Sequence, residues 1–220
     1  MIYHQHAYAL ALAALLTPRT RWLDLGAGTR LHGGWQSPTA AELARIARPI
    51  GCDLLPRHLR QHPHLAAAVT ATGQALPFAD QSLDLVTANM TIEHLPDPLA
   101  VLQEVRRVLK PGGRFLCVTP NRRHPAVALL ATLFRPGLRR LVARILEPRR
   151  DPAHIFPTFY RANTRGRLQD LCWTAGLEGE VTVFRSTPTG GWLARTVLRL
   201  ACWPPAEWFG SNLLGLVIRR

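Results

Sequence analysis

The sequence has almost no lysine. Lys110 is the only one, and arginine supplies the rest of the basic charge. Lysine and arginine together number 27, against 14 acidic residues, which gives a formal net charge of +13 over 220 residues. A protein with this charge is attracted to polyanions such as nucleic acids and acidic lipids. The positions of the arginines therefore matter more than their number.

Cysteine is also scarce. The four cysteines are scattered, with no CxxC pair and no cluster of other metal ligands near them. This spacing excludes a disulfide framework and is typical of a reducing compartment. His58, His62 and His64 resemble a metal-binding group, but Pro63 interrupts them and a fourth ligand is missing. We expect them to lie in a solvated loop, and we predict no metal site.

Long apolar runs are missing too. No stretch reaches the roughly 18 to 20 residues of a membrane span, and no repeat or low-complexity tract is present. The apolar run from Ala7 to Leu16 has no basic residue before it, and an expected strand starts soon after, at Arg21. We therefore predict a helix packed on the first strand, one domain over residues 1–220, and a cytoplasmic protein.

Short apolar runs alternate with helical patterns through the first 120 residues. The expected strands are Arg21–Leu25, Pro49–Asp53, Ala67–Thr70, Leu83–Ala88, Arg114–Thr119, Leu177–Phe184 and Leu213–Ile218. One helix is expected at Pro98–Leu109, with Asp97 as its N-cap and a stop and turn at Lys110–Gly113; another is expected at Thr164–Ala175. This order predicts an α/β fold with a doubly wound, mostly parallel sheet.

The most informative segment is Asp24-Leu25-Gly26-Ala27-Gly28, which covers the end of the first expected strand and the turn after it. Glycine accepts a positive φ at little cost and lets a ligand lie against bare backbone. The carboxylate of Asp24 is expected at the carboxyl end of its strand, where open α/β sheets bind ligands. A third glycine that would close a helix onto a pyrophosphate is missing, because Arg30 and Leu31 follow. The pattern favours a ligand without phosphates.

Three further segments occupy the ends of the next strands. Asp53 ends the second strand, where an acid can accept both hydroxyls of a ribose. Gly73 and Gln74 follow the third strand and offer a small residue and an amide beside a flat ligand. Asn89 and Met90 end the fourth. The neighbouring segment LPF (76–78) is better explained as a packing corner.

In this order and spacing, residues 21–121 resemble the class I S-adenosylmethionine-dependent methyltransferases, in particular the type 11 group. The motifs that carry the resemblance are LDLGAG, GCDLL, ALPFADQSLDLV, IEHLPDP, LQEVRRVLKPGG and TPN. The resemblance implies a Rossmann-like fold of seven strands whose last strand is antiparallel, with S-adenosyl-L-methionine as the cofactor.

The same resemblance implies roles for individual residues. The cofactor residues would be Asp24, Gly26, Ala27, Gly28, Asp53, Leu54, Gly73, Gln74, Asn89 and Met90. The glycine turn would hold the methionine end, Asp53 the ribose and Leu54 the adenine. Gly73 and Gln74 would face the adenine edge, while Asn89 and Met90 would lie under the sulfonium. Thr72 stands where this group commonly has an acid.

A catalytic base is needed only if the acceptor must lose a proton to become nucleophilic, as an alcohol must. His94, just after the fourth strand, is the leading candidate. Anchoring of its loop through a hydrogen bond is the alternative role. His154 and Tyr160 are the second-choice acid and base groups.

Two inserts, residues 122–163 and 188–210, are expected to form a helical lid over the acceptor. In the first, Arg139, Arg140 and Arg144 lie opposite an apolar stripe, and in the second, arginines alternate with apolar residues between tryptophans. Such helices can lie on an anionic membrane surface. The alternative is that the stripes pack on the domain and the arginines are solvated.

The predicted function is methyl transfer to an oxygen of a small-molecule, glycan or lipid-linked acceptor, with peripheral contact at the inner face of an anionic membrane. An RNA methyltransferase is an alternative that the charge favours. It ranks lower because no RNA-binding module is visible, so we do not expect a nucleic-acid partner. A domain that binds S-adenosylmethionine without turnover is the third possibility.

Overall fold

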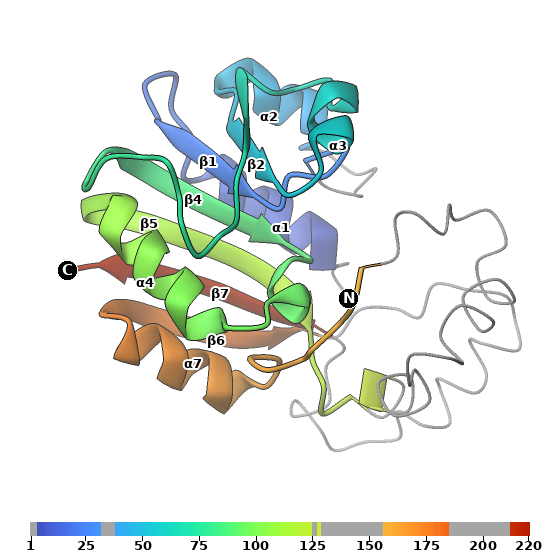
Figure 1. Ribbon diagram of the computed structural model, residues 1–220, viewed down its shortest axis with the longest axis vertical. Helices are drawn as coiled ribbons and strands as arrows, with labels where there is room; N and C mark the ends of the chain where they lie inside the picture. Colours follow the sequence, from blue (N-terminus) through green and yellow to red (C-terminus); the bar gives the residue numbers. More distant parts are fainter. Residues whose placement is uncertain (1–3, 32–37, 125–126, 129–155, 185–211) are drawn as a thin grey trace, which may run out of the picture.

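A seven-stranded sheet forms the centre of the protein (Figure 1). The computed structural model describes residues 4–31, 38–124, 127–128, 156–184 and 212–220. Its strands are β1 (Trp22–Leu25), β2 (Ile50–Asp53), β3 (Ala67–Thr70), β4 (Leu83–Asn89), β5 (Leu109–Pro120), β6 (Leu177–Phe184) and β7 (Asn212–Arg219). Their order is β3-β2-β1-β4-β5-β7-β6, and only β7 runs antiparallel to its neighbours. The predicted fold class is confirmed.

Helices cover both faces of the sheet. The described helices are α1 (His4–Ala13), α2 (Ala40–Ile46), α3 (Pro56–Gln61), the 3-10 helix η1 (Ile92–His94), α4 (Pro98–Val108) and α7 (Arg165–Thr174). α4 and α7 lie on the near face in Figure 1, and α1 lies behind the sheet. The two faces bury separate apolar clusters, one with α4 and α7 and the other with α1 and α2. This is the doubly wound arrangement that the alternating pattern predicts.

The predicted N-terminal helix is present as α1. Its buried side chains, Tyr8 and Leu12 among them, share a cluster with Trp22 of β1 and Leu116 of β5. The helix therefore packs across several strands and not on the first strand alone. None of the described helices is long and apolar enough to cross a bilayer.

The connection from α4 to β5 differs from the prediction. The Asp97 side chain caps α4 as expected by accepting from the amide of Ala100 at 3.2 Å. The strand, however, begins at Leu109, directly after the helix, and not at Arg114. Leu83 of β4 pairs with Leu109 and Leu85 pairs with Arg114, so the segment 110–113 is an irregularity within β5 and does not precede the strand.

Both inserts connect at the edge of the sheet where the parallel strands end. Pro120 at the end of β5 pairs with Asn212 at the start of β7, which pairs in turn with Phe184 at the end of β6. Residues 129–155 and 185–211, which make up most of the two inserts, lie outside the described residues. The lid helices and their membrane contact therefore stay predictions.

Candidate active site

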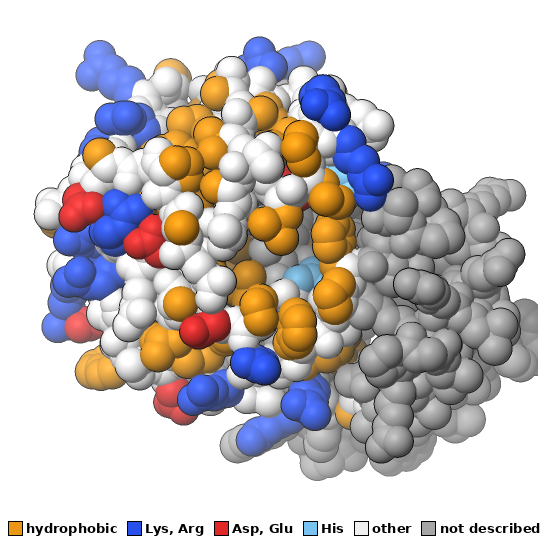
Figure 2. Space-filling model, viewed as in Figure 1, with side chains coloured by type: hydrophobic (Ala, Val, Ile, Leu, Met, Phe, Trp, Pro, Cys, Tyr) orange, Lys and Arg blue, Asp and Glu red, His pale blue; other side chains and the backbone are white. Residues whose placement is uncertain are grey.

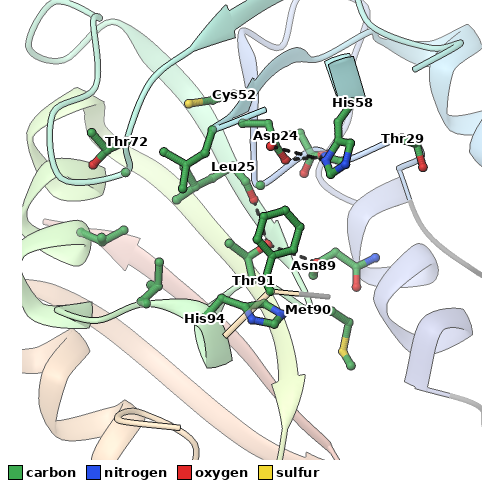
Figure 3. Close-up of a pocket in the computed structure, with 18 of the residues that line it drawn as sticks. Asp24, Leu25, Thr29, Cys52, His58, Thr72, Asn89, Met90, Thr91 and His94 are labelled. Atoms are coloured by element: carbon green, nitrogen blue, oxygen red, sulfur yellow. Dashed lines mark hydrogen bonds and ion pairs between the residues drawn. The ribbon is translucent and has the colours of Figure 1, made fainter. Parts of the chain in front are cut away.

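A cavity of about 1190 Å³ lies at the carboxyl ends of β1, β2 and β4 (Figure 3). In Figure 2, hydrophobic side chains surround a hollow in this face, and a histidine ring is visible inside it. Nine of the ten predicted cofactor residues line the cavity: Asp24, Gly26, Gly28, Asp53, Leu54, Gly73, Gln74, Asn89 and Met90. Ala27 does not, because its side chain is buried beneath the turn and lies close to Gly51.

The glycine turn is tied to the neighbouring strand. The amides of Gly26 and Ala27 both donate to the carbonyl of Cys52, at 2.7 and 3.1 Å. Gly26 has a φ of +70°, and a Cβ there would lie 2.4 Å from Oγ1 of Thr91. Both the backbone conformation and the space therefore require glycine at this position.

Asp24 lies buried at the start of the turn and accepts a hydrogen bond from the Thr87 hydroxyl at 2.7 Å. The indole of Trp22 donates to that same hydroxyl at 2.8 Å, which fixes its direction. Burial raises the pKa of Asp24 to about 7, and the nearby carboxylate of Asp53 adds to the rise. A bound ammonium group would favour the charged form, so this carboxyl suits the amino group of an amino acid.

Asp53 links β2 to the glycine turn. One carboxylate oxygen accepts from the amide of Gly28 at 3.0 Å, and the other accepts from the amide of Leu55 at 2.8 Å. The Nδ1 atom of His58 lies 3.6 Å from the second oxygen. A carboxylate has about four lone-pair positions, so these two amide bonds leave acceptor capacity for hydroxyl groups. The side chain of Leu54 is 62% exposed beside it and offers an apolar surface.

The loop after β3 supplies the opposite edge of the cavity. A Cβ on Gly73 would lie 3.1 Å from Val101 of α4, so the backbone passes close to that helix. The Thr72 hydroxyl accepts from the amide of Gln74 at 3.0 Å and shapes the turn. Leu76 is buried, and its amide donates to Glu104, in agreement with the predicted packing corner.

Helix α1 forms a wall of the cavity that the sequence did not indicate. The side-chain amides of Gln5 and Asn89 pair reciprocally, at 3.0 and 2.9 Å, and Asn89 also donates to the carbonyl of Leu31 at 3.2 Å. His4 lines the cavity next to this pair, and burial lowers its pKa to about 4, so its ring is neutral. Asn89 therefore holds α1 and the end of the glycine loop in place.

His94 lies on the other side of the cavity from Asp24 (Figure 3). Its Nδ1 atom is 2.8 Å from the carbonyl of Pro157. A carbonyl only accepts, so Nδ1 carries the proton and Nε2 keeps its lone pair in the neutral ring. The structure thus shows the anchoring bond and assigns the basic nitrogen of the ring to Nε2. Phe156, which the sequence did not single out, packs edge-on against both His94 and His58, with ring centroids 5.8 Å apart in each pair.

Glu93 lies behind His94 and is 4% exposed. Its carboxylate accepts from the Thr119 hydroxyl at 2.8 Å, and Asn163 donates to that hydroxyl at 2.7 Å. Its other oxygen is 3.9 Å from Nε2 of His94. Burial raises the pKa of Glu93 to about 7.

Other predicted positions differ. Tyr160 is not among the residues that line the cavity; its amide donates to the carbonyl of Glu93 at 3.2 Å. His154 lies outside the described residues. The expected solvated histidine loop is wrong, because His58 and His62 are buried, at 3% and 7% exposure. Within the described part of the chain, no group of three His, Cys, Asp or Glu side chains could hold a metal ion.

Comparison with known proteins agrees with this geometry. Residues 23–117, which contain the glycine turn, Asp53 and His94, match the family described as "Methyltransferase domain". Over these residues, a little under half of its length, the chain is similar to a class I methyltransferase domain. Its fold is similar to that of an S-adenosylmethionine-dependent methyltransferase from Thermotoga maritima (TM-score 0.62, 19% identity, 99% of this chain and 91% of that chain).

Curated relatives match part of this chain. A demethylmenaquinone methyltransferase from Corynebacterium efficiens is 33% identical over 132 residues, covering 59% of this chain and 54% of that protein. A ubiquinone biosynthesis O-methyltransferase from Cereibacter sphaeroides is 35% identical over 116 residues, covering 50% and 44%. The chain spans about half the length of these two relatives.

The methyltransferase family implies S-adenosylmethionine as the cofactor, and the residues present fit it. Gly26 and Gly28 leave bare backbone at the cavity. A Cβ at Gly26 would clash with the side chain of Thr91. Asp24 offers a buried carboxyl for an ammonium group, and Asp53 offers a carboxylate at the end of the next strand.

Proposed function

We propose that this protein transfers the methyl group of S-adenosyl-L-methionine to an oxygen of a small-molecule, glycan or lipid-linked acceptor. The observation that carries the proposal is that nine predicted cofactor residues and His94 line one cavity. The relatives named for demethylmenaquinone methylation and for O-methylation in ubiquinone biosynthesis support an acceptor of this kind.

Some of the cavity residues bind the methyl donor, and His94 acts on the methyl acceptor. When bound, the cofactor supplies an electrophilic methyl group on a sulfonium. Asp24 takes the methionine ammonium, Asp53 the ribose hydroxyls, and Leu54 the apolar face of the adenine. His94 accepts the proton of the acceptor hydroxyl at Nε2. Holding both reactants in line in one cavity supplies most of the acceleration, because the leaving group is already activated.

Calorimetry with S-adenosylhomocysteine tests the donor site. We expect one site in the wild-type protein, and an Asp53→Asn variant that binds at least about tenfold more weakly, because charge-assisted hydrogen bonds to the ribose are lost. Asp170→Asn, an exposed position on α7, is the matched control and is expected to bind like the wild type. Absence of binding to the folded wild-type protein would overturn the proposal.

A further inference from the structure

A buried carboxyl lies next to the proposed base. Glu93 belongs to the short helix η1, which follows β4, and its side chain points away from solvent toward Thr119 of β5. It is not among the residues that line the cavity. It therefore reaches the acceptor side only through its neighbour, His94, whose side chain is 29% exposed.

The backbone around Glu93 is fixed from several directions. Its carbonyl accepts from the amides of Phe159 and Tyr160, at 2.8 and 3.2 Å. The segment that begins with Phe156 is thus fastened to η1, and the same segment supplies the Pro157 carbonyl that holds Nδ1 of His94. These bonds fix the orientation of the ring and assign its basic nitrogen to Nε2.

Among the described lysines, arginines and histidines, only His94 has a side-chain nitrogen within 4 Å of the Glu93 carboxylate. The Oε2 atom of Glu93 accepts a hydrogen bond from the Thr119 hydroxyl, while its Oε1 atom lies 3.9 Å from Nε2 of His94. No lysine or arginine of the described chain forms an ion pair with Glu93. The thiol of Cys117 also lies near Glu93, and burial raises the pKa of that thiol and keeps it protonated.

A purely structural role does not call for an acid here. A glutamine could accept the same bond from Thr119 without the cost of burying a carboxyl. An acid becomes useful when a positive charge forms next to it, and among the described residues the imidazole of His94 is in position to gain one.

From this geometry we infer that Glu93 is a positioning residue that stabilises the protonated form of His94 during methyl transfer. The inference rests on the proposed function. The acceptor oxygen forms its bond to the methyl carbon as the carbon–sulfur bond breaks, and that electron pair stays on sulfur. The hydroxyl proton passes to Nε2 of His94, and the imidazolium formed lies opposite the Glu93 carboxylate. The proton then leaves to water.

NMR titration of the protein labelled at its histidine rings measures this coupling without any acceptor. A His94→Gln variant assigns the His94 signals. We expect Glu93→Gln to lower the pKa of His94 by about one unit or more, a tenfold loss of proton affinity. Glu180→Gln, exposed on β6, is the matched control and is expected to leave the pKa unchanged.

Two outcomes contradict the inference. One is a folded Glu93→Gln protein in which His94 titrates as in the wild type. If Glu93→Gln does not fold, the titration of Glu93 is measured in His94→Gln through the NMR signal of the Glu93 carboxyl carbon. Loss of the His94 charge must raise the pKa of Glu93. An unchanged Glu93 titration there is the second contradicting outcome. Calorimetry with S-adenosylhomocysteine tests the donor site and does not depend on either titration. A failure of the proposed function can therefore be told apart from a failure of the Glu93 inference.

Discussion

Replacing Gly26 with alanine tests the turn on which the donor site depends. The backbone there has a φ of +70°, and an added Cβ would lie 2.4 Å from Oγ1 and 2.6 Å from Cγ2 of Thr91. The left-handed conformation costs an L-residue about 1–2 kcal/mol. Forcing extra atoms into a packed site costs about 1–3 kcal/mol. We therefore expect Gly26→Ala to lower the free energy of unfolding by about 2–5 kcal/mol.

The two contributions can be separated with a second substitution. Thr91→Ala removes both of the atoms that the new Cβ would meet most closely, so the double variant should recover the steric part, about 1–3 kcal/mol. The strain from the positive φ should remain. Urea unfolding followed by tryptophan fluorescence measures all four proteins, and calorimetry with S-adenosylhomocysteine should show weaker binding by Gly26→Ala.

A matched control exists on α7. A Cβ at Gly166 would meet nothing within 4 Å, so Gly166→Ala is expected to leave stability unchanged or slightly raised. The reasoning is refuted if Gly26→Ala is as stable as the wild type, or if Thr91→Ala restores none of the loss.

Three further predictions concern charge. The pKa of Asp24 is raised to about 7 in the folded protein, so burial of its carboxylate lowers the free energy of unfolding as pH rises from about 4 to 7. Asp24→Asn should remove this loss of stability, which is about 4 kcal/mol at most. Urea unfolding of both proteins at pH 5 and pH 8 measures the difference. Arg219 donates to the carbonyls of Arg106 and Arg107 at the end of α4, so Arg219→Met should lower the free energy of unfolding by about 1–3 kcal/mol. Arg220 forms an exposed ion pair with Glu178, so Arg220→Met, the control, should lower it by under about 1 kcal/mol. Thermal melting measures both variants. If the first insert binds an anionic membrane, reversing the charges at 139, 140 and 144 should abolish sedimentation with phosphatidylglycerol vesicles; unchanged sedimentation would contradict the membrane contact.

The part of the fold that local pattern determines could be predicted from the sequence. The expected strands at Ala67–Thr70 and Leu177–Phe184 coincide with β3 and β6, and the Asp97 cap is where the sequence places it. The start of β5 could not be predicted, because Pro111 and two glycines normally mark a turn. Here a register shift against β4 keeps the segment within the strand.

The site could be predicted where each residue lies at the carboxyl end of its own strand, as Asp24, Asp53 and Asn89 do. It could not be predicted where distant segments meet. Gln5 pairs with Asn89 across 84 residues, and His94 meets Pro157 across 63. Neither contact leaves a spacing or a motif in the sequence. The buried state of Glu93 likewise depends on Thr119 of another strand.

The most direct test of the donor site is a crystal structure of the protein with S-adenosylhomocysteine. We expect the ribose hydroxyls within hydrogen-bond distance of the Asp53 carboxylate, the amino group beside Asp24, and the sulfur facing the side of the cavity that holds His94. A ligand bound outside this cavity, or bound within it with the ribose away from Asp53, would contradict the proposed site.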